Sequence, residues 1–196
     1  MDDDVERTLR ADPTIARLID RHGRLTVTPA ADEFRRLCRS IVNQQLSTAS
    51  AEAIRDRAFA VLDDEVTPER VLAADADRLR DAGLSETKVE YLRSAARAFT
   101  DRDLRRGALA DLSDEAVVDE LTTITRVGEW TARMYLLFAL GREDVLPLGD
   151  LAVRRGIEAL YNDGEELSRA EMRGIASSWR PYRSYGTRYV WAAYES

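Results

Sequence analysis

Apolar residues recur along this chain at spacings of three and four positions, and polar residues fill the positions between them. The clearest case is Phe34, Leu37, Cys38, Ile41 and Val42, which fall at i, i+3, i+4, i+7 and i+8. This period is that of an α-helix with one apolar face. No alternating pattern longer than a few residues indicates a β-strand. The pattern therefore predicts an all-α fold of about ten helices.

Short polar residues mark where these helices begin. The predicted N-caps are Asp12 and Thr67, each followed by proline, and Asp75, Ser85, Ser113 and Ser168. Such side chains accept hydrogen bonds from the first backbone N–H groups of a helix, and proline suits the first helical position. A break at residues 43–46 separates two core helices, and Ser47 is predicted to cap the second.

The stretch from residue 121 to residue 156 combines two features of a binding site. Residues 124–128, Ile-Thr-Arg-Val-Gly, predict a tight turn that leads into a helix ending at Gly141. A helix that starts at a turn presents free backbone N–H groups and positive dipole charge, which suit a phosphate. Beyond Pro147, the pair Gly149 and Asp150 precedes a second apolar helix. Asp150 is therefore predicted at a helix N-cap.

Composition restricts the class of protein and its cofactors. The 196 residues suffice for one compact unit, and 44% hydrophobic with 33% charged residues is typical of a soluble globular protein. No apolar run approaches the roughly 20 residues of a membrane helix, and the acidic N-terminus does not resemble a signal peptide, so we expect a cytoplasmic protein. The single cysteine, Cys38, excludes an internal disulfide and a four-cysteine cluster, and lies on a core face as an inert filler. With one histidine, His22, and no ligand-spaced cluster, we expect neither metal nor cofactor.

The net charge of −7 is unfavourable for a DNA-binding protein, because affinity for DNA comes largely from neutralising phosphates. The charge is unevenly distributed, however. Residues 1–20 carry six acids and three arginines, whereas residues 167–196 carry five arginines and two acids. The acidic excess is therefore concentrated away from the candidate site.

Aromatic residues are concentrated near the C-terminus. Residues 178–194 hold two of the three tryptophans and four of the seven tyrosines. A dense aromatic helix face most often belongs to the core. It is also what a pocket for a flat base requires.

These motifs together resemble the helix–hairpin–helix (HhH-GPD) superfamily of DNA glycosylases, and most closely its alkylated-base, 3-methyladenine type II branch. The hairpin and the aspartate carry the resemblance, and three further patches agree with it in the family's order: residues 40–47, 83–88 and 179–185. Together they span most of the chain. There is one departure, since the family hairpin has glycine on both sides of its central aliphatic residue and this chain has Arg126 before Val127. Arginine is penalised where φ must be positive, although its side chain could add a phosphate contact.

The resemblance implies a two-lobed fold with a cleft between the lobes. One lobe would be residues 33–144, containing the hairpin 121–133, and the other would be residues 1–32 plus 145–196, within a single glycosylase unit 1–196. The partner implied is double-stranded DNA containing a damaged base, and we expect a monomer that does not associate with membranes.

The resemblance also implies site residues. Asp150 would be the catalytic carboxylate, although an aspartate at a helix start is more often only a cap, worth about 1 kcal/mol. Asp144, the nearest competing acid, is expected to be solvated in a charged surface run. The base pocket would be formed by Trp130 and Tyr182, supported by Trp179 and Tyr185. The DNA-binding residues would be Thr125, Arg126, Val127, Gly128, Thr131 and Lys88, and one of Gln45, Leu46 and Ser47 would enter the base stack.

The implied activity is excision of alkylated purines such as 3-methyladenine by hydrolysis of the N-glycosidic bond. Lyase members of the superfamily carry lysine at the position of Trp130, where it forms a Schiff base. Because this chain has tryptophan there, we expect a monofunctional enzyme. Two alternatives remain: a glycosylase for oxidised or mismatched bases, and a non-catalytic module that binds DNA lesions or DNA structures.

Overall fold

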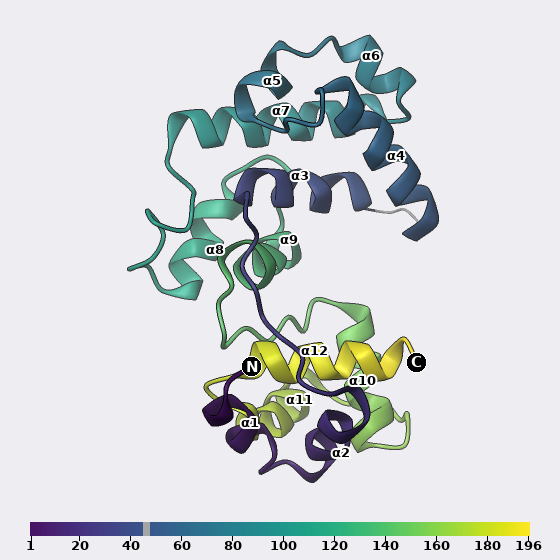
Figure 1. Cartoon of the computed structure of the whole chain (residues 1–196), viewed down its shortest axis with the longest axis vertical. Coiled ribbons are helices and arrows are strands. Elements are labelled where there is room, and N and C mark those ends of the chain that lie inside the picture. The colour runs from purple at the N-terminus through teal and green to yellow at the C-terminus, as the bar shows by residue number, and fades with distance from the viewer. Residues whose placement is uncertain (45–47) are drawn as a thin grey trace. The chain divides into compact units, whose positions relative to one another are not determined.

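The structure is a computed structural model that describes residues 1–44 and 48–196, and the side chains of all of these except 48 and 49 (Figure 1). Within these ranges the chain forms twelve α-helices, one π-helical turn and one 3₁₀ turn, and it contains no β-strand. The all-α prediction is therefore confirmed, with two α-helices more than expected. The stack-entering candidates Gln45, Leu46 and Ser47, and the predicted cap at Ser47, lie outside the described residues.

The chain divides into two compact units, each with its own core. The first unit comprises Met1–Pro29 and Leu136–Ser196, and the second is the continuous segment Ala30–Tyr135. Both chain ends lie in the first unit (Figure 1).

The second unit is built from seven helices around an apolar centre. They are α3 (Glu33–Asn43), α4 (Thr48–Val61), α5 (Pro68–Ala73), α6 (Ala76–Asp81), α7 (Glu86–Asp101), α8 (Asp114–Thr122) and α9 (Glu129–Tyr135). The apolar face predicted for α3 is buried, with Cys38 fully enclosed, and burial raises the pKa of its thiol. Phe99 of α7 contacts both Phe34 and Tyr135, with ring centroids 5.1 and 6.3 Å apart. These contacts join α3, α7 and α9.

The first unit is formed by both ends of the chain. Its elements are α1 (Asp3–Leu9), α2 (Pro13–His22), the π-helical turn η1 (Leu136–Leu140), α10 (Leu151–Tyr161), α11 (Arg169–Ile175), the 3₁₀ turn η2 (Ala176–Trp179) and α12 (Arg183–Tyr194). Its core combines residues of α1 and α2 with residues of α10, α11 and α12. The N-terminal helices therefore complete a core that the C-terminal segment supplies.

The helix boundaries follow the predicted caps. Asp12, Thr67, Asp75, Ser85, Ser113, Asp150 and Ser168 each accept a hydrogen bond from a backbone N–H in the first turn of the helix that follows. Ser168 and Glu171 also form a reciprocal capping box. These positions could be predicted because a cap involves only neighbouring residues.

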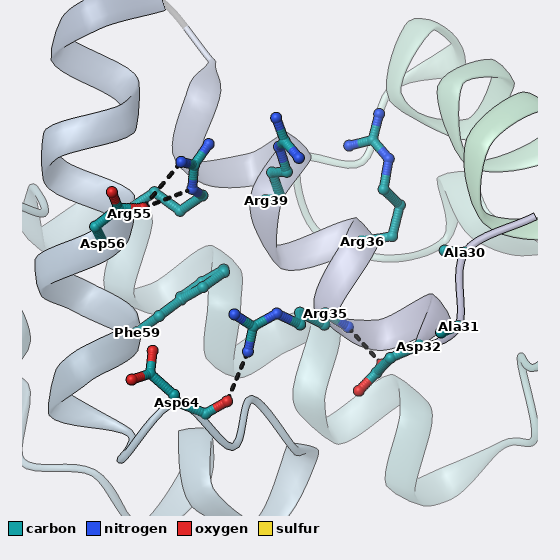
Figure 2. Close-up of a pocket in the computed structure, with 10 residues that line it drawn as sticks. All are labelled: Ala30, Ala31, Asp32, Arg35, Arg36, Arg39, Arg55, Asp56, Phe59 and Asp64. Atoms are coloured by element: carbon teal, nitrogen blue, oxygen red, sulfur yellow. Dashed lines mark hydrogen bonds and ion pairs between the residues drawn. The ribbon is translucent and has the colours of Figure 1, made fainter.

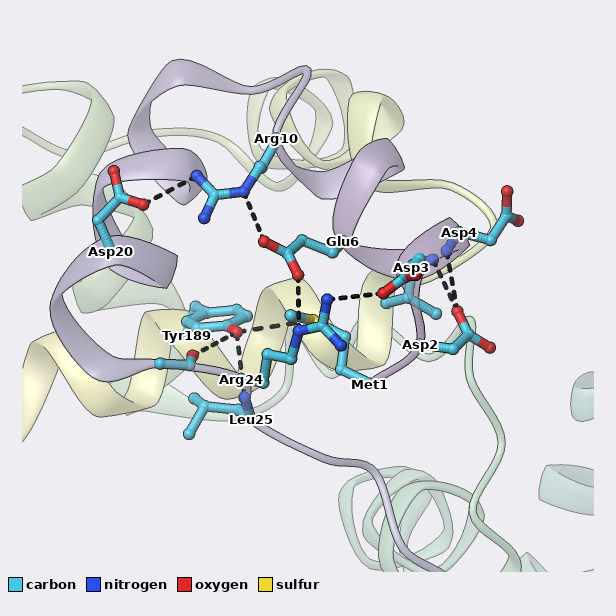
Figure 3. Close-up of polar contacts among 12 residues, drawn as sticks. Met1, Asp2, Asp3, Asp4, Glu6, Arg10, Asp20, Arg24, Leu25 and Tyr189 are labelled. Atoms are coloured by element: carbon cyan, nitrogen blue, oxygen red, sulfur yellow. Dashed lines mark hydrogen bonds and ion pairs between the residues drawn. The ribbon is translucent and has the colours of Figure 1, made fainter.

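A polar cluster fixes the connector after α2 to the first unit (Figure 3). The Tyr189 hydroxyl donates to the Gly23 carbonyl at 2.8 Å and accepts from the Leu25 N–H at 3.1 Å. Arg24 donates to Glu6 at 2.8 Å, and Glu6 also accepts from Arg10 at 2.7 Å. The hydrogen bonds of Arg10 and Arg24 lower the pKa of the Glu6 carboxyl. The connector is thereby attached to both α1 and α12.

Asp12 is a buried polar centre of the first unit. Its side chain is 7% exposed. One oxygen accepts the Thr14 and Ile15 N–H groups at 2.8 and 3.1 Å, which makes Asp12 the N-cap of α2. The other oxygen accepts from Tyr161 Oη at 2.9 Å and Trp179 Nε1 at 3.0 Å. The carboxylate therefore joins α2 to α10 and η2.

Gly186 of α12 lies directly against the indole of Trp179. A Cβ added at Gly186 would lie 2.5 Å from Cε3 and 2.7 Å from Cδ2 of that ring. We expect Gly186→Ala to lower the free energy of unfolding by about 1–3 kcal/mol, because the buried ring has no space to move. Urea denaturation followed by circular dichroism measures the change. The control is Gly174→Ala in α11, where nothing lies within 4 Å. Equal stability of the two variants would contradict the prediction.

Candidate functional site

The predicted catalytic carboxylate, Asp150, stands at the start of α10 in the first unit. Its backbone N–H donates to the Pro147 carbonyl at 2.9 Å, which closes the turn, and its Oδ1 accepts the Val153 N–H at 3.0 Å. The Arg154 side chain donates to the Leu148 and Gly149 carbonyls at 3.0 and 3.3 Å. The loop and the carboxylate are thus both fixed, and the Asp150 side chain is only half-buried.

The first residues of α12 hold the segment that leads to this loop. The buried Ser184 hydroxyl accepts the Val145 N–H at 2.9 Å and donates to the Arg142 carbonyl at 2.6 Å. Arg183 Nε donates to Asp144 Oδ1 at 2.6 Å. The expectation of a solvated Asp144 was therefore wrong, because the carboxylate is paired with Arg183 and partly covered by it.

One aromatic residue that the sequence did not single out contacts Asp150, and a second stacks on the first. Trp191 of α12 donates its indole N–H to Asp150 Oδ1 at 3.3 Å. Phe138 stacks on Trp191 with centroids 5.6 Å apart and planes 16° apart. Trp191 belongs to the aromatic-rich segment, but nothing in its position, 41 residues after Asp150, indicated the contact. The structure thus adds Trp191 and Phe138 to the candidate site.

The other aromatic candidates of the first unit differ in exposure. Trp179 is fully buried, and its indole N–H is used by Asp12, so its ring has no exposed face for a base. Tyr182 is partly exposed and donates to Asp4 at 2.8 Å, and this hydrogen bond raises the pKa of the phenol. Tyr185 contacts Tyr182 edge to face and donates to Glu143 at 2.9 Å. Burial raises the pKa of Tyr185 to about 12.

The predicted hairpin lies in the second unit between α8 and α9. Val127 donates to the Ile124 carbonyl at 3.0 Å, and both side chains are buried, which anchors the turn. Thr125, Arg126 and Gly128 are exposed. Trp130, in the first turn of α9, is 36% exposed, which is unusual for a side chain of this size. The hairpin therefore presents its polar residues and one tryptophan outward.

Thr131 and Lys88 have intramolecular partners that account for their positions. Thr131 is 3% exposed, and its hydroxyl accepts from Gln44 Nε2 at 3.2 Å. Lys88 Nζ donates to the Val42 carbonyl, near the end of α3, at 2.6 Å. Partial burial lowers the pKa of this lysine. Both residues support the segment that leads into residues 45–47, and their DNA contacts stay a prediction.

Arg126 takes the positive φ that its position in the hairpin demands. Its φ is 66°, whereas Gly128 has no positive φ, and its guanidinium lies 5.9 Å from the Tyr91 ring centroid. We expect Arg126→Gly to be more stable to urea than Arg126→Ala by about 1 kcal/mol, because glycine has no side-chain penalty in this region. Gly128→Ala, where nothing lies within 4 Å, is the control. Equal midpoints for the two Arg126 variants would contradict the assignment of strain.

Two negative findings concern the described residues only. No cluster of three or more histidine, cysteine or acidic side chains could hold a metal ion there. Nor does any described helix have the length and apolar character to cross a membrane.

The fold and these motifs define an all-α protein with a helix–hairpin–helix and a loop-borne aspartate. Residues 38–181 match the family described as HhH-GPD superfamily base excision DNA repair protein. The match runs through α3, the hairpin, the Asp150 loop and Trp179. The chain therefore belongs to the HhH-GPD superfamily.

Relatives and solved structures agree with this assignment. The chain is 29% identical over 163 residues to DNA-3-methyladenine glycosylase 1 of Schizosaccharomyces pombe, covering 82% of this chain and 72% of that protein. It is 32% identical over 151 residues to DNA-3-methyladenine glycosylase of Saccharomyces cerevisiae, covering 72% and 51%. The chain also spans 58% of the length of a Bacillus subtilis relative.

Among solved structures, a DNA-3-methyladenine glycosidase from Bacillus halodurans superposes with a TM-score of 0.87 at 31% identity, covering 100% of this chain and 90% of the other. The S. pombe 3-methyladenine DNA glycosylase in complex with abasic DNA gives a TM-score of 0.84 at 28% identity, covering 96% and 95%.

Proposed function

We propose that this protein is a monofunctional DNA glycosylase that excises alkylated purines of the 3-methyladenine type during base excision repair. The observation that carries the proposal is the half-exposed Asp150 carboxylate, oriented by the Val153 N–H and the Trp191 indole. The names of the relatives, which cite 3-methyladenine, support the choice of substrate. Its partner is double-stranded DNA with a damaged base, and it acts as a cytoplasmic monomer.

Once the alkylated base has left the DNA stack, cleavage of its N-glycosidic bond needs little catalytic assistance to the leaving group. Extruding the nucleotide costs roughly a few kcal/mol. A purine alkylated at N3 or N7 is already cationic and leaves without protonation. The carboxylate of Asp150 stabilises the oxocarbenium-like transition state or activates the attacking water.

Aromatic rings select the cationic base. A cation over an aromatic face gains about 0.5–2 kcal/mol, and a neutral purine gains less. The exposed Trp130 and the partly exposed Tyr182 are the candidates for this contact, with Tyr185 supporting Tyr182. Trp191, stacked on Phe138 beside Asp150, is a further candidate. In this proposal the hairpin residues 125–128 bind the DNA backbone.

We expect no strand cleavage, because lyase activity requires a lysine amine in the active site and this chain has tryptophan at that position. Lys88 is the only lysine of the chain, and its Nζ donates to the Val42 carbonyl. Trp130 occupies the position that is lysine in lyase members. No amine is therefore assigned to form a Schiff base with the sugar.

The test is release of free base from methylated duplex DNA by the purified protein. We expect free 3-methyladenine, an abasic site left uncut, and no protein–DNA adduct after borohydride treatment. A trapped adduct would contradict the monofunctional assignment. Release only from oxidised or mismatched duplexes would overturn the substrate class, and tight lesion binding without any release would indicate a non-catalytic binding module.

A further inference from the structure

A cavity of about 630 Å³ opens beside α3 and α4 in the second unit (Figure 2). It is lined by Ala30, Ala31, Asp32, Arg35, Arg36, Arg39, Arg55, Asp56, Phe59 and Asp64. Four of these ten residues are arginines. Neither the hairpin nor Asp150 lines this cavity, so it is distinct from the candidate site described above.

Three of the arginines gather on one side of the cavity. Arg36 and Arg39 extend from successive turns of α3, and Arg55 extends from α4 towards them (Figure 2). Arg35 is turned the other way. Its guanidinium lies 4.8 Å from the Phe59 ring centroid and donates to the Asp64 carbonyl at 2.6 Å. The remaining three guanidinium groups form what we call the basic rim.

The acids of the cavity do not neutralise the whole basic rim. Asp32 accepts the Arg35 N–H at 2.8 Å as the cap of α3. Asp56 is largely exposed and pairs with Arg55 at 2.9 Å. Among the residues that the structure describes, no carboxylate pairs with Arg39. The rim therefore keeps an excess of positive charge.

Two further observations concern the surroundings of Arg36 and Arg55. Burial, together with repulsion from Arg39, lowers the pKa of the Arg36 guanidinium to about 10. The Arg55 side chain is 15% exposed, and its Nη1 is buried without a hydrogen-bond partner in the described part of the chain. A buried donor without an acceptor is unfavourable. An anion in the cavity would relieve both effects.

We infer that the basic rim formed by Arg36, Arg39 and Arg55 binds a phosphoryl group. Guanidinium groups present planar pairs of N–H donors that match phosphate oxygens, and hydrogen bonds between charged partners are about twice as strong as neutral ones. The source that agrees with the proposed function is a backbone phosphate of a DNA strand. In that form the inference rests on the proposed function and adds a second DNA contact to the hairpin. A free phosphorylated molecule has the same chemistry.

The test compares Arg39→Gln and the double variant Arg36→Gln/Arg39→Gln with the wild type. Arg39 is exposed, so its replacement leaves the fold intact, which urea denaturation verifies. The control is Arg97→Gln, an exposed arginine of α7 outside the cavity. Binding to an undamaged 20-base-pair duplex is measured at several salt concentrations, and binding of inorganic pyrophosphate is measured by calorimetry.

With a DNA phosphate on the rim, Arg39→Gln weakens duplex binding about five- to tenfold in 0.1 M salt and reduces the log–log salt slope by about 0.9, whereas Arg97→Gln does neither. Unchanged duplex binding with loss of pyrophosphate binding supports the phosphoryl site and assigns it to a small molecule. No change in either ligand overturns the inference. The undamaged duplex contains no base to excise, so this measurement does not depend on base release. The phosphoryl site and the proposed glycosylase activity can therefore be contradicted independently of each other.

Discussion

Replacing Asp150 with asparagine is expected to lower the rate of base release from methylated DNA by about 100- to 1,000-fold. The amide keeps the shape of the side chain but has no negative charge to stabilise a developing oxocarbenium ion. The amide oxygen can still accept the Val153 N–H and the Trp191 indole N–H. Single-turnover release of free base, measured by chromatography, reports the change.

Stability separates this effect from damage to the fold. Asparagine is as good an N-cap as aspartate, so the free energy of unfolding should change by less than about 1 kcal/mol. Asp163→Asn, at the other end of α10, is the matched control, because Asp163 is exposed and asparagine also tolerates its φ of 50°. Base release by Asp150→Asn at the wild-type rate would leave Asp150 as a cap alone.

Asp12→Ala is expected to produce the largest loss of stability, about 3–5 kcal/mol. The substitution removes the cap of α2 and deprives the buried Trp179 Nε1 and the partly buried Tyr161 Oη of their acceptor. Burial, reinforced by the adjacent Asp12 charge, raises the pKa of the Tyr161 phenol, so this group stays a neutral donor in ordinary buffers. Urea denaturation monitored by tryptophan fluorescence measures the loss.

The matched control is Asp75→Ala. Asp75 caps α6 in the same way, by accepting from the N–H groups of Asp77 and Arg78. Within the described part of the chain, its side chain accepts no further hydrogen bond that links it to another helix. Its replacement should cost about 1 kcal/mol. Equal losses at Asp12 and Asp75 would show that the contacts of Asp12 with η2 and α10 contribute little.

The contrast between these two aspartates explains what the sequence could predict about the fold. Both were predicted as N-caps, because a cap depends on the next three residues. The additional role of Asp12 depends on Tyr161 and Trp179, which lie 149 and 167 residues further along the chain. No periodic pattern or local motif encodes such a contact. Helices and their starts were therefore predictable, whereas the polar centre of the first unit was not.

The candidate site also contains some features that the sequence could predict and others that it could not. Asp150 and the hairpin could be predicted because each is a local turn followed by a helix start. The sequence also predicted that Arg126 carries a conformational penalty, because its position in the hairpin requires a positive φ. In the structure its φ is 66°. Trp191 and the pairing of Asp144 with Arg183 could not be predicted, since both depend on how α12 packs. The cleft between lobes and the roles assigned to the site residues stay predictions.

The discontinuity of the first unit has a consequence for biosynthesis. Residues 30–135 form a continuous segment and can acquire their tertiary contacts while later residues are still being added by the ribosome. α1 and α2 emerge before this segment, yet Tyr189 and Trp179, to which they attach, are translated after it. The apolar faces of α1 and α2 therefore stay exposed until the residues of α10, α11 and α12 that cover them have been translated. A chaperone that binds nascent chains would find its principal target in residues 3–22.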